Sequence, residues 1–327
     1  MKAVQNIKSN VVIAIPSALK KHSPIRSLGL ILLAYVSLYG AIGGTYFTWI
    51  SNLGLPVQII CQVFLCTVAS YAIVLLGFLG HDGFHFSLHP NRKISCWLGI
   101  IISSPILHLV SGFALSHWNH HRFTNEDKDP DVKMFVTYKH LISRLLFSRL
   151  AAETSYVRNA IQIAFGSYLP NYNFPLPYRE MKSFARWNLV MSIIFLGAYS
   201  AVFFVNPRLF FSFVAIYTIG AMHSGLTPYI QHSKTKAGIG ADTRTVTGFW
   251  PDLVFLHNNY HLEHHLYPTI PGYNLKRVHR YLKENGYYDH DDRVTAHGLL
   301  ETYSTVLSDF PYPELVETAV EEKSTGT

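Results

Sequence analysis

Long apolar runs alternate with long polar stretches along the chain. Four of the runs contain no Asp, Glu, Lys or Arg, and short links join them in pairs. Because about 20 helical residues cross the hydrocarbon core of a bilayer, these runs predict four transmembrane helices in two tight hairpins. The predicted spans are Ser27–Ile50, Leu55–Gly80, Trp187–Val205 and Leu209–Ile230.

A fifth apolar run, Cys96–Ser116, contains Pro105 and His108. If this run crossed the membrane, it would separate the two long polar stretches onto opposite sides. We therefore expect an interfacial or re-entrant helix over about 96–116, with His108 as a structural residue. The predicted fold class is an all-α membrane protein, with four transmembrane helices in two hairpins and a cytoplasmic helical cap.

The pattern also suggests three segments. We expect residues 1–26 to form a cytoplasmic N-terminal segment, residues 27–305 to form the membrane domain, and residues 306–327 to form a flexible tail. Hydrophobic residues make up 49% of the chain and charged residues only 14%, which is about half the usual charged share of a soluble domain.

The basic residues lie on one side of the predicted spans. Five of the 27 Lys and Arg residues precede the first run, twelve lie in 81–186, nine follow residue 230, and one lies in the short links. Because cytoplasmic loops are enriched in Lys and Arg, we place both termini in the cytoplasm. The net charge of +7 then reflects topology, and no basic–aromatic motif indicates a nucleic-acid partner.

Three histidine clusters carry the candidate chemistry. They are His81 and His85; His117, His120 and His121; and His261, His264 and His265. Residues three or four apart share a helix face, so each cluster directs two or three imidazoles to one point. Two HxxHH motifs arise by chance in roughly one chain in a thousand. Eight imidazoles exceed the needs of one ion and suit two; Fe, Zn, Cu and Ni all accept such ligands.

The residues around two of these clusters resemble the integral-membrane fatty acid desaturase family, with its hydroxylase and carotenoid-oxygenase relatives. The similar segments are His117–Asn125 with the acidic Asp127–Asp131, and Asn259–Pro268. The resemblance covers 81 to about 275. It implies a pair of iron ions bound by the eight histidines and by a ninth near the end of the last span. His232 matches that position better than His223, which is about half a turn out of phase with it.

Metal-bound imidazoles need hydrogen-bond acceptors for their outer N–H groups. The polar residues near the clusters that could orient them are His257, Asp82, Asp127, Asp129, Asp131, Asp242 and Glu263.

The resemblance implies an O2-dependent oxidoreductase that oxidises an unactivated C–H bond, with the bilayer and an acyl lipid as partners. Desaturation of a fatty acyl chain is the favoured reaction. A hydroxylase or ketolase acting on a carotenoid or another lipid-like molecule stays open, and a metal transporter or sensor is a remote alternative. The sequence has no GxGxxG motif and no cysteine set for an iron–sulfur cluster. We therefore expect electrons from an external donor such as a ferredoxin or cytochrome b5.

Overall fold

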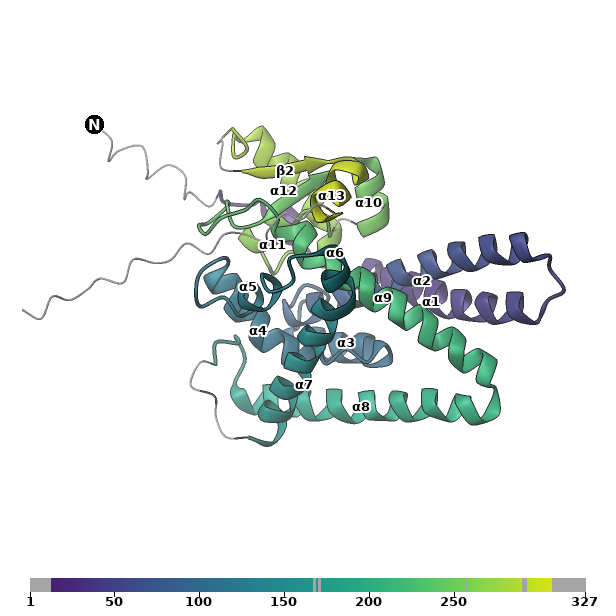
Figure 1. The fold of residues 1–327 in the computed structure, drawn as a ribbon. Coiled ribbons are helices and arrows are strands. Elements are labelled where there is room, and N and C mark those ends of the chain that lie inside the picture. The colour runs from purple at the N-terminus through teal and green to yellow at the C-terminus, as the bar shows by residue number, and fades with distance from the viewer. Residues whose placement is uncertain (1–12, 167–168, 170–171, 257, 290–292, 308–327) are drawn as a thin grey trace, which may run out of the picture.

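Four long helices form two hairpins whose tips lie at the same end of the molecule (Figure 1). The computed structural model describes residues 13–166, 169, 172–256, 258–289 and 293–307. The hairpins are α1 (Pro24–Ile50) with α2 (Leu55–Phe84), and α8 (Tyr178–Val205) with α9 (Pro207–His232). The Asn206 side-chain amide at one tip donates a hydrogen bond of 2.9 Å to the Tyr46 hydroxyl of the other hairpin.

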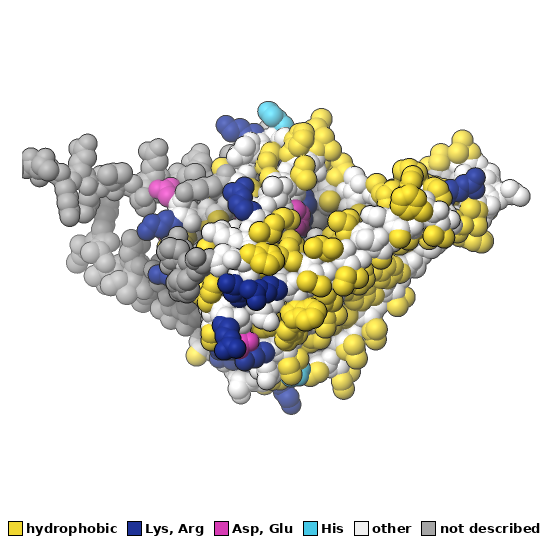
Figure 2. Space-filling model, turned by 90° about the horizontal axis from the view of Figure 1, so that it is seen from below, with side chains coloured by type: hydrophobic (Ala, Val, Ile, Leu, Met, Phe, Trp, Pro, Cys, Tyr) yellow, Lys and Arg dark blue, Asp and Glu magenta, His cyan; other side chains and the backbone are white. Residues whose placement is uncertain are grey.

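These four helices are long and apolar enough to cross a membrane. Their outward faces carry large exposed apolar side chains, such as Phe204 and Val205 at 85% and 86% exposure. Figure 2 shows hydrophobic side chains along the hairpin part of the surface, and most Lys and Arg side chains on the opposite part. Such a surface is stable only against lipid. The chain is an all-α integral membrane protein.

Helix α8 begins at Tyr178 instead of Trp187, nine residues earlier than the apolar run predicts. The added turns carry basic residues with defined partners. Lys182 Nζ donates to the Gly166 carbonyl at 3.1 Å, and Arg186 Nε donates to the Ala164 carbonyl at 2.9 Å. These cations satisfy carbonyls at the C-terminal end of α7, a site that favours positive charge.

The fifth apolar run differs from the single helix expected over 96–116. It forms α3 (Arg92–Ser103), the 3₁₀ turn η3 (Ser104–Ile106) and α4 (Val110–Phe123), with a bend of 117° between its two arms. A broken helix in a membrane needs protein partners for its freed carbonyls. The Tyr199 and Tyr217 hydroxyls supply them, donating to the Pro105 carbonyl at 2.7 and 2.6 Å.

Two glycines bring α3 against the end of α2. A Cβ at Gly83 would lie 2.5 Å from the Gly99 Cα, so only glycine allows this approach. The contact holds the last turn of α2, which carries His81, in a fixed position beside α3.

The remaining elements form a head at the end of the hairpins opposite their tips (Figure 1). We define the head as α4 to α7, α10 to α13 and a strand pair. Its further helices are α5 (Pro130–Phe135), α6 (Leu141–Ser143), the π turn η4 (Arg144–Ser148), α7 (Arg149–Phe165), α10 (Phe249–Phe255), α11 (His261–Leu266), α12 (Gly272–Glu284) and α13 (Gly298–Leu307).

The strand pair, which the sequence did not predict, joins two distant parts of the head. β1 (Arg244–Thr247) runs parallel to β2 (Val294–His297), with Arg244 opposite Val294. The described part of the N-terminal segment also packs on the head. Asn274 Nδ2 of α12 donates to the Leu19 carbonyl at 3.1 Å, in the turn η2 (Ser17–Lys20). Residues 1–12 and 308–327, which include most of the expected flexible tail, lie outside the described residues.

Candidate metal centre

All nine histidines named from the sequence meet where the head joins α2 and α9. In the described part of the chain they form two groups, within each of which the candidate ligand nitrogens lie within 4.8 Å of one another. The first group contains His81, His85, His117, His121 and His264, and the second contains His120, His232 and His265. His261 adjoins the second group, because its Nε2 lies 3.3 Å from Nε2 of His232.

Each HxxHH motif contributes to both groups. On α4, His117 and His121 are four residues apart and face the first group, while His120 faces the second. On α11, His264 faces the first group, and the His265 ring lies 4.6 Å from that of His261 on the other side. The spacing therefore serves two neighbouring sites from one helix, since residues three and four apart lie on slightly different faces.

The nitrogens of these groups are crowded and only partly bonded. His117 Nε2 lies 2.9 Å from Nε2 of both His81 and His121. Both ring nitrogens of His85, Nδ1 of His117 and His121, and Nε2 of His265 are buried without a hydrogen-bond partner. An unpaired buried polar atom costs about 1–3 kcal/mol. Two metal ions would accept the lone pairs that converge here, and neutral imidazoles are suitable ligands for iron.

Burial keeps most of these rings neutral. It lowers the pKa well below the usual histidine value, and neighbouring imidazoles lower it further, for His85, His117, His121, His261, His264 and His265. A neutral imidazole keeps the lone pair that a metal requires. His120 differs: burial opposes its charge, but Asp129 raises its pKa to about 9.

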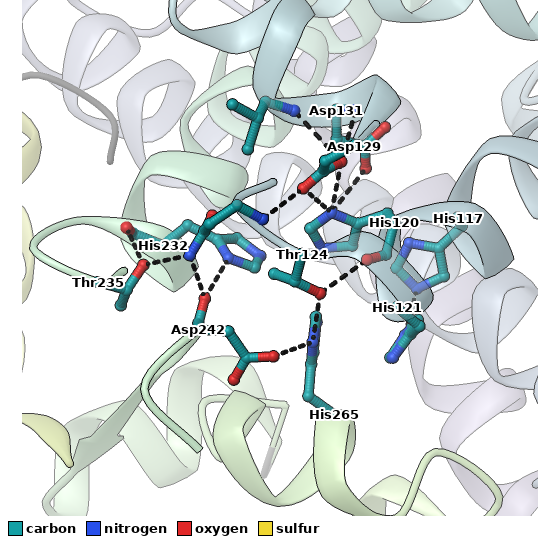
Figure 3. Close-up of polar contacts among 12 residues, drawn as sticks. His117, His120, His121, Thr124, Asp129, Asp131, His232, Thr235, Asp242 and His265 are labelled. Carbon is teal, nitrogen blue, oxygen red and sulfur yellow. Dashed lines mark hydrogen bonds and ion pairs between the residues drawn. The ribbon is translucent and has the colours of Figure 1, made fainter. Parts of the chain in front are cut away.

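Asp129 orients His120 (Figure 3). His120 Nδ1–H donates to Asp129 Oδ2 at 2.9 Å, and both side chains are buried. The same carboxylate accepts the backbone N–H groups of Asn125 and Asp131, both at 2.9 Å, and so caps α5. Burial would raise the pKa of Asp129, but His120 and these amides hold it below its usual value. The bond leaves Nε2 of His120 free to face the second group.

Oxygen atoms also lie beside Nδ1 of three other rings, those of His81, His232 and His265. His81 Nδ1 lies 3.1 Å from Asp82 Oδ1, and His232 Nδ1–H donates to the Asp242 carbonyl at 3.0 Å. Asp242 Oδ2 lies 3.7 Å from His265 Nδ1. Asp131 is more distant from its ring, with Oδ2 4.0 Å from His120 Nδ1. The two contacts within hydrogen-bond distance, at His81 and His232, leave Nε2 of these rings to face the centre.

Glu263 acts differently from the role expected for it. Its fully buried carboxylate accepts hydrogen bonds from His279 Nδ1 at 2.6 Å, from Thr245 Oγ1 at 2.5 Å and from the Tyr288 hydroxyl. It therefore holds α11 to β1 and α12. No local pattern pointed to these three partners, which lie 16 to 25 residues away. The other candidate, His257, lies outside the described residues.

His223, the competitor of His232, lies apart from both groups. Its Nδ1 lies 3.3 Å from Ser70 Oγ, and its Nε2 lies 3.2 Å from the Tyr303 hydroxyl. Its ring contacts Tyr71 edge-on at 4.5 Å. These contacts use both of its nitrogens within the helix bundle.

A cavity of about 510 Å³ ends at the two histidine groups. His81, His117, His120, His232 and His261 line one end, and mostly apolar side chains of α2, α4, α7 and α9 line the rest. Its lining extends along α9 from Val214 to His232, about 27 Å at 1.5 Å per residue. The cavity thus runs from the metal centre toward the middle of the membrane-spanning helices.

Sequence reasoning did not assign a site role to several polar residues of the cavity wall. Among them, His108, Arg149 and Glu153 form a cluster. The available signal was Arg149 and Glu153 standing four residues apart, on one helix face, in a largely apolar stretch.

Comparison with known proteins agrees with this geometry. The chain is 25% identical to the sn-1 oleoyl-lipid 12-desaturase of Synechocystis sp., over 63% of this chain and 64% of that protein. It is 22% identical to the chloroplastic omega-6 fatty acid desaturase of Glycine max, over 63% and 53%. It is 25% identical to the Delta 8-(E)-sphingolipid desaturase of Emericella nidulans, over 64% and 46%.

The matched regions cover between about half and two thirds of these relatives. The model of the family described as "Fatty acid desaturase" matches residues 53–297, well over half of the chain. That range contains both hairpin-to-head junctions and all nine histidines of the centre. The chain belongs to the fatty acid desaturase family.

Proposed function

We propose that this protein is a membrane-bound, O2-dependent oxidoreductase that introduces a C=C bond into a fatty acyl chain. One observation carries the proposal: two groups of histidines close the end of a long apolar cavity that extends into the membrane-spanning helices. An acyl chain in that cavity would present one of its carbons to the histidines. The relatives bear the names of lipid and sphingolipid desaturases, which supports this choice.

The histidine groups would hold two iron ions. His81, His85, His117, His121 and His264 would bind one, and His120, His232, His261 and His265 would bind the other. Iron supplies the reduction of O2 and the removal of hydrogen from a strong C–H bond. By accepting the outer N–H groups, Asp82, Asp129 and the Asp242 carbonyl would leave the Nε2 atoms of His81, His120 and His232 available to the ions.

The cavity wall binds the chain and excludes water. Phe113 stacks on His117 with ring centroids 4.6 Å apart, and Phe135 and Tyr156 line the same wall. Apolar contacts of this kind supply most of the affinity for an acyl chain, by burial of its surface. Because the wall packs against the ligand histidines, it would also determine which carbon stands next to them.

We further propose that the head lies in the cytoplasm, because the basic segments flank the hairpins on the head side. Electrons would come from a ferredoxin or a cytochrome b5, as acidic donors are attracted to a basic face.

Two alternatives lead to different outcomes. A hydroxylase or ketolase acting on a carotenoid or other lipid would use the same centre and give an oxygenated product. A metal transporter or sensor would place its ligands along a path through the spans. In the described residues, the nine histidines instead gather at the head ends of α2 and α9 and on the head itself.

The test is expression of the wild type and of His261→Ala in a bacterial host, with gas chromatography–mass spectrometry of the lipids. We expect new double bonds with the wild type only, and close to two iron ions per purified chain. His89→Ala, in the turn before α3, is the matched control and should match the wild type. An alcohol or ketone product would indicate the hydroxylase or ketolase reaction, and a single zinc ion per chain would contradict the mechanism.

A further inference from the structure

A cluster of charged and polar side chains lies in the mostly apolar cavity wall. We call Arg149, Glu153 and His108 the polar triad. His108 Nδ1–H donates to Glu153 Oε1 at 2.9 Å, and Arg149 Nη2 forms an ion pair with the same oxygen. The side chains are only 4% exposed for His108, 26% for Glu153 and 24% for Arg149. All three line the cavity that ends at the histidines.

The polar triad is incomplete, because Glu153 Oε2 is buried without a hydrogen-bond partner. Burial would raise the pKa of Glu153, but Arg149 and His108 hold it below its usual value, so the carboxylate is ionised. An ionised oxygen can only accept hydrogen bonds. Leaving Glu153 Oε2 unpaired in a mostly apolar cavity wall is costly. A molecule that occupies the cavity and donates a hydrogen bond to this oxygen would remove that cost.

The charges of the polar triad decide which occupant fits. Arg149 and Glu153 neutralise each other, and hence the cluster does not attract a phosphate or a free carboxylate. An ester or thioester carbonyl can accept from Arg149 but cannot donate to Glu153. A hydroxyl group does both. The other acid of the cavity, Asp131, lies next to His120, with its Oδ2 4.0 Å from His120 Nδ1.

The polar triad is close to the metal centre. The Phe113 ring lies between them, with its centroid 5.5 Å from that of His108 and 4.6 Å from that of His117. Arg149 packs beside Gly225 of α9, because a Cβ added at Gly225 would lie 3.4 Å from the Arg149 Cβ. Gly225 is seven residues before His232, or about 10 Å along the helix. A group held by the triad would therefore stand about 10 Å from the carbon at the histidines, a distance that several methylene groups span.

We propose that the polar triad is a specificity site that binds a hydroxyl group of the lipid substrate. This inference rests on the proposed function, because it takes the cavity to be the acyl site. It narrows the substrate class from plain acyl chains to lipids that carry a hydroxyl about 10 Å along the chain from the oxidised C–H bond. The hydroxyl would donate to Glu153 Oε2 and accept from Arg149.

The experiment measures binding separately from turnover. Purified wild-type protein in detergent is titrated with methyl octadecanoate, with its derivatives hydroxylated at successive mid-chain carbons, and with octadecanol. A hydrogen bond to a charged group corresponds to at least about 10-fold in affinity. We expect at least one mid-chain hydroxylated ester to bind that much more tightly than the plain ester. A preference for octadecanol alone would assign the hydroxyl to the chain end, as in a head-group alcohol.

The double variant Arg149→Met/Glu153→Leu removes both charges together, so that neither is left unpaired. We expect it to bind hydroxylated and plain esters equally. Thr154→Ala, on the exposed side of α7, is the matched control and should keep the preference. A wild type without any preference, or a double variant that retains it, would overturn the inference. Membranes from a host that expresses the wild type are also tested for oxidation of both lipids. If they oxidise neither lipid while the purified protein keeps its binding preference, the proposed enzymatic function is rejected and the hydroxyl site remains supported.

Discussion

At the scale of single residues, one buried carboxylate links local folding to the metal centre. Asp129 accepts backbone N–H groups that begin α5 and also holds the His120 ring. It is fully buried, so its charge is stable only because every partner is present. Asp129 therefore both caps the start of α5 and orients the candidate metal ligand His120.

Asp129→Ala tests this double role. We expect the loss of the cap to lower the free energy of unfolding by about 1–2 kcal/mol. With His120 no longer oriented, iron should fall from two ions toward one per chain. Asp129→Asn keeps an acceptor for the backbone, so it should restore much of the stability while binding metal about 10- to 100-fold more weakly. Thermal unfolding and elemental analysis give the two values, with exposed Glu126→Gln as control.

If the alanine variant keeps two ions, Asp129 has only a structural role.

His232 and His223 form a matched pair on one helix. His232 adjoins His120 and His261, with ring centroids 4.8 and 5.1 Å away, whereas His223 bonds Ser70 and Tyr303. We expect His232→Ala to lose metal from the second group and to abolish turnover. His223→Ala should retain its iron. Iron content per chain is measured for both variants. Loss of iron from His223→Ala but not from His232→Ala would assign the ninth ligand to His223.

At the scale of elements, the position of α4 depends on its close approach to α7. A Cβ at Gly112 would lie 1.9 Å from the Tyr156 carbonyl oxygen and 2.8 Å from the Ala160 nitrogen. Both are backbone atoms, so no side-chain rotation can relieve the overlap. Since α4 carries His117, His120 and His121, this contact sets the distance between these three histidines and the part of the cavity wall that α7 forms.

Gly112→Ala should therefore push the two helices apart. We expect a large loss of thermal stability and of bound iron, although alanine by itself favours a helix over glycine by about 1 kcal/mol. Gly40→Ala in α1 is the control, because nothing lies within 4 Å of its added Cβ, and it should be neutral or stabilising. Equal melting temperatures for the two variants would show that α4 and α7 can separate without cost.

At the scale of the whole molecule, both hairpins enter the membrane from the head and turn at the same far end (Figure 1). The two polar stretches that carry the histidines therefore start from one side. Tyr199 and Tyr217, from the second hairpin, also secure the bend at Pro105. The bend returns the fifth apolar run to the head, and as a result α4 reaches the same centre as α2, α9 and α11.

Thiol labelling of intact bacterial cells tests the orientation. In a background with Cys61, Cys66 and Cys96 replaced by alanine, a membrane-impermeant reagent should label Leu53→Cys, in the first hairpin tip. It should label Glu126→Cys, on the exposed surface of the head, only after the membrane is made permeable. Labelling of both sites in intact cells, or the opposite order, would contradict a cytoplasmic head.

The sequence by itself determined the membrane spans, the hairpins and the identity of the clustered histidines. These depend on local patterns: an uncharged run such as Leu55–Gly80 has to be a helix in lipid, and an HxxHH spacing has to place imidazoles on neighbouring faces. The eight histidines named in this way, and His232, which the family resemblance added, lie together in the structure.

Only the tertiary structure decided how those residues are shared and supported. It divided each HxxHH motif between two groups, and it turned Glu263 toward His279. It broke the fifth run between Ile106 and Val110, and it brought His108 against Glu153, 45 residues away. The physical reason is that these contacts join segments distant in the chain. Their geometry follows from helix packing and close glycine contacts, which no local pattern of residues encodes.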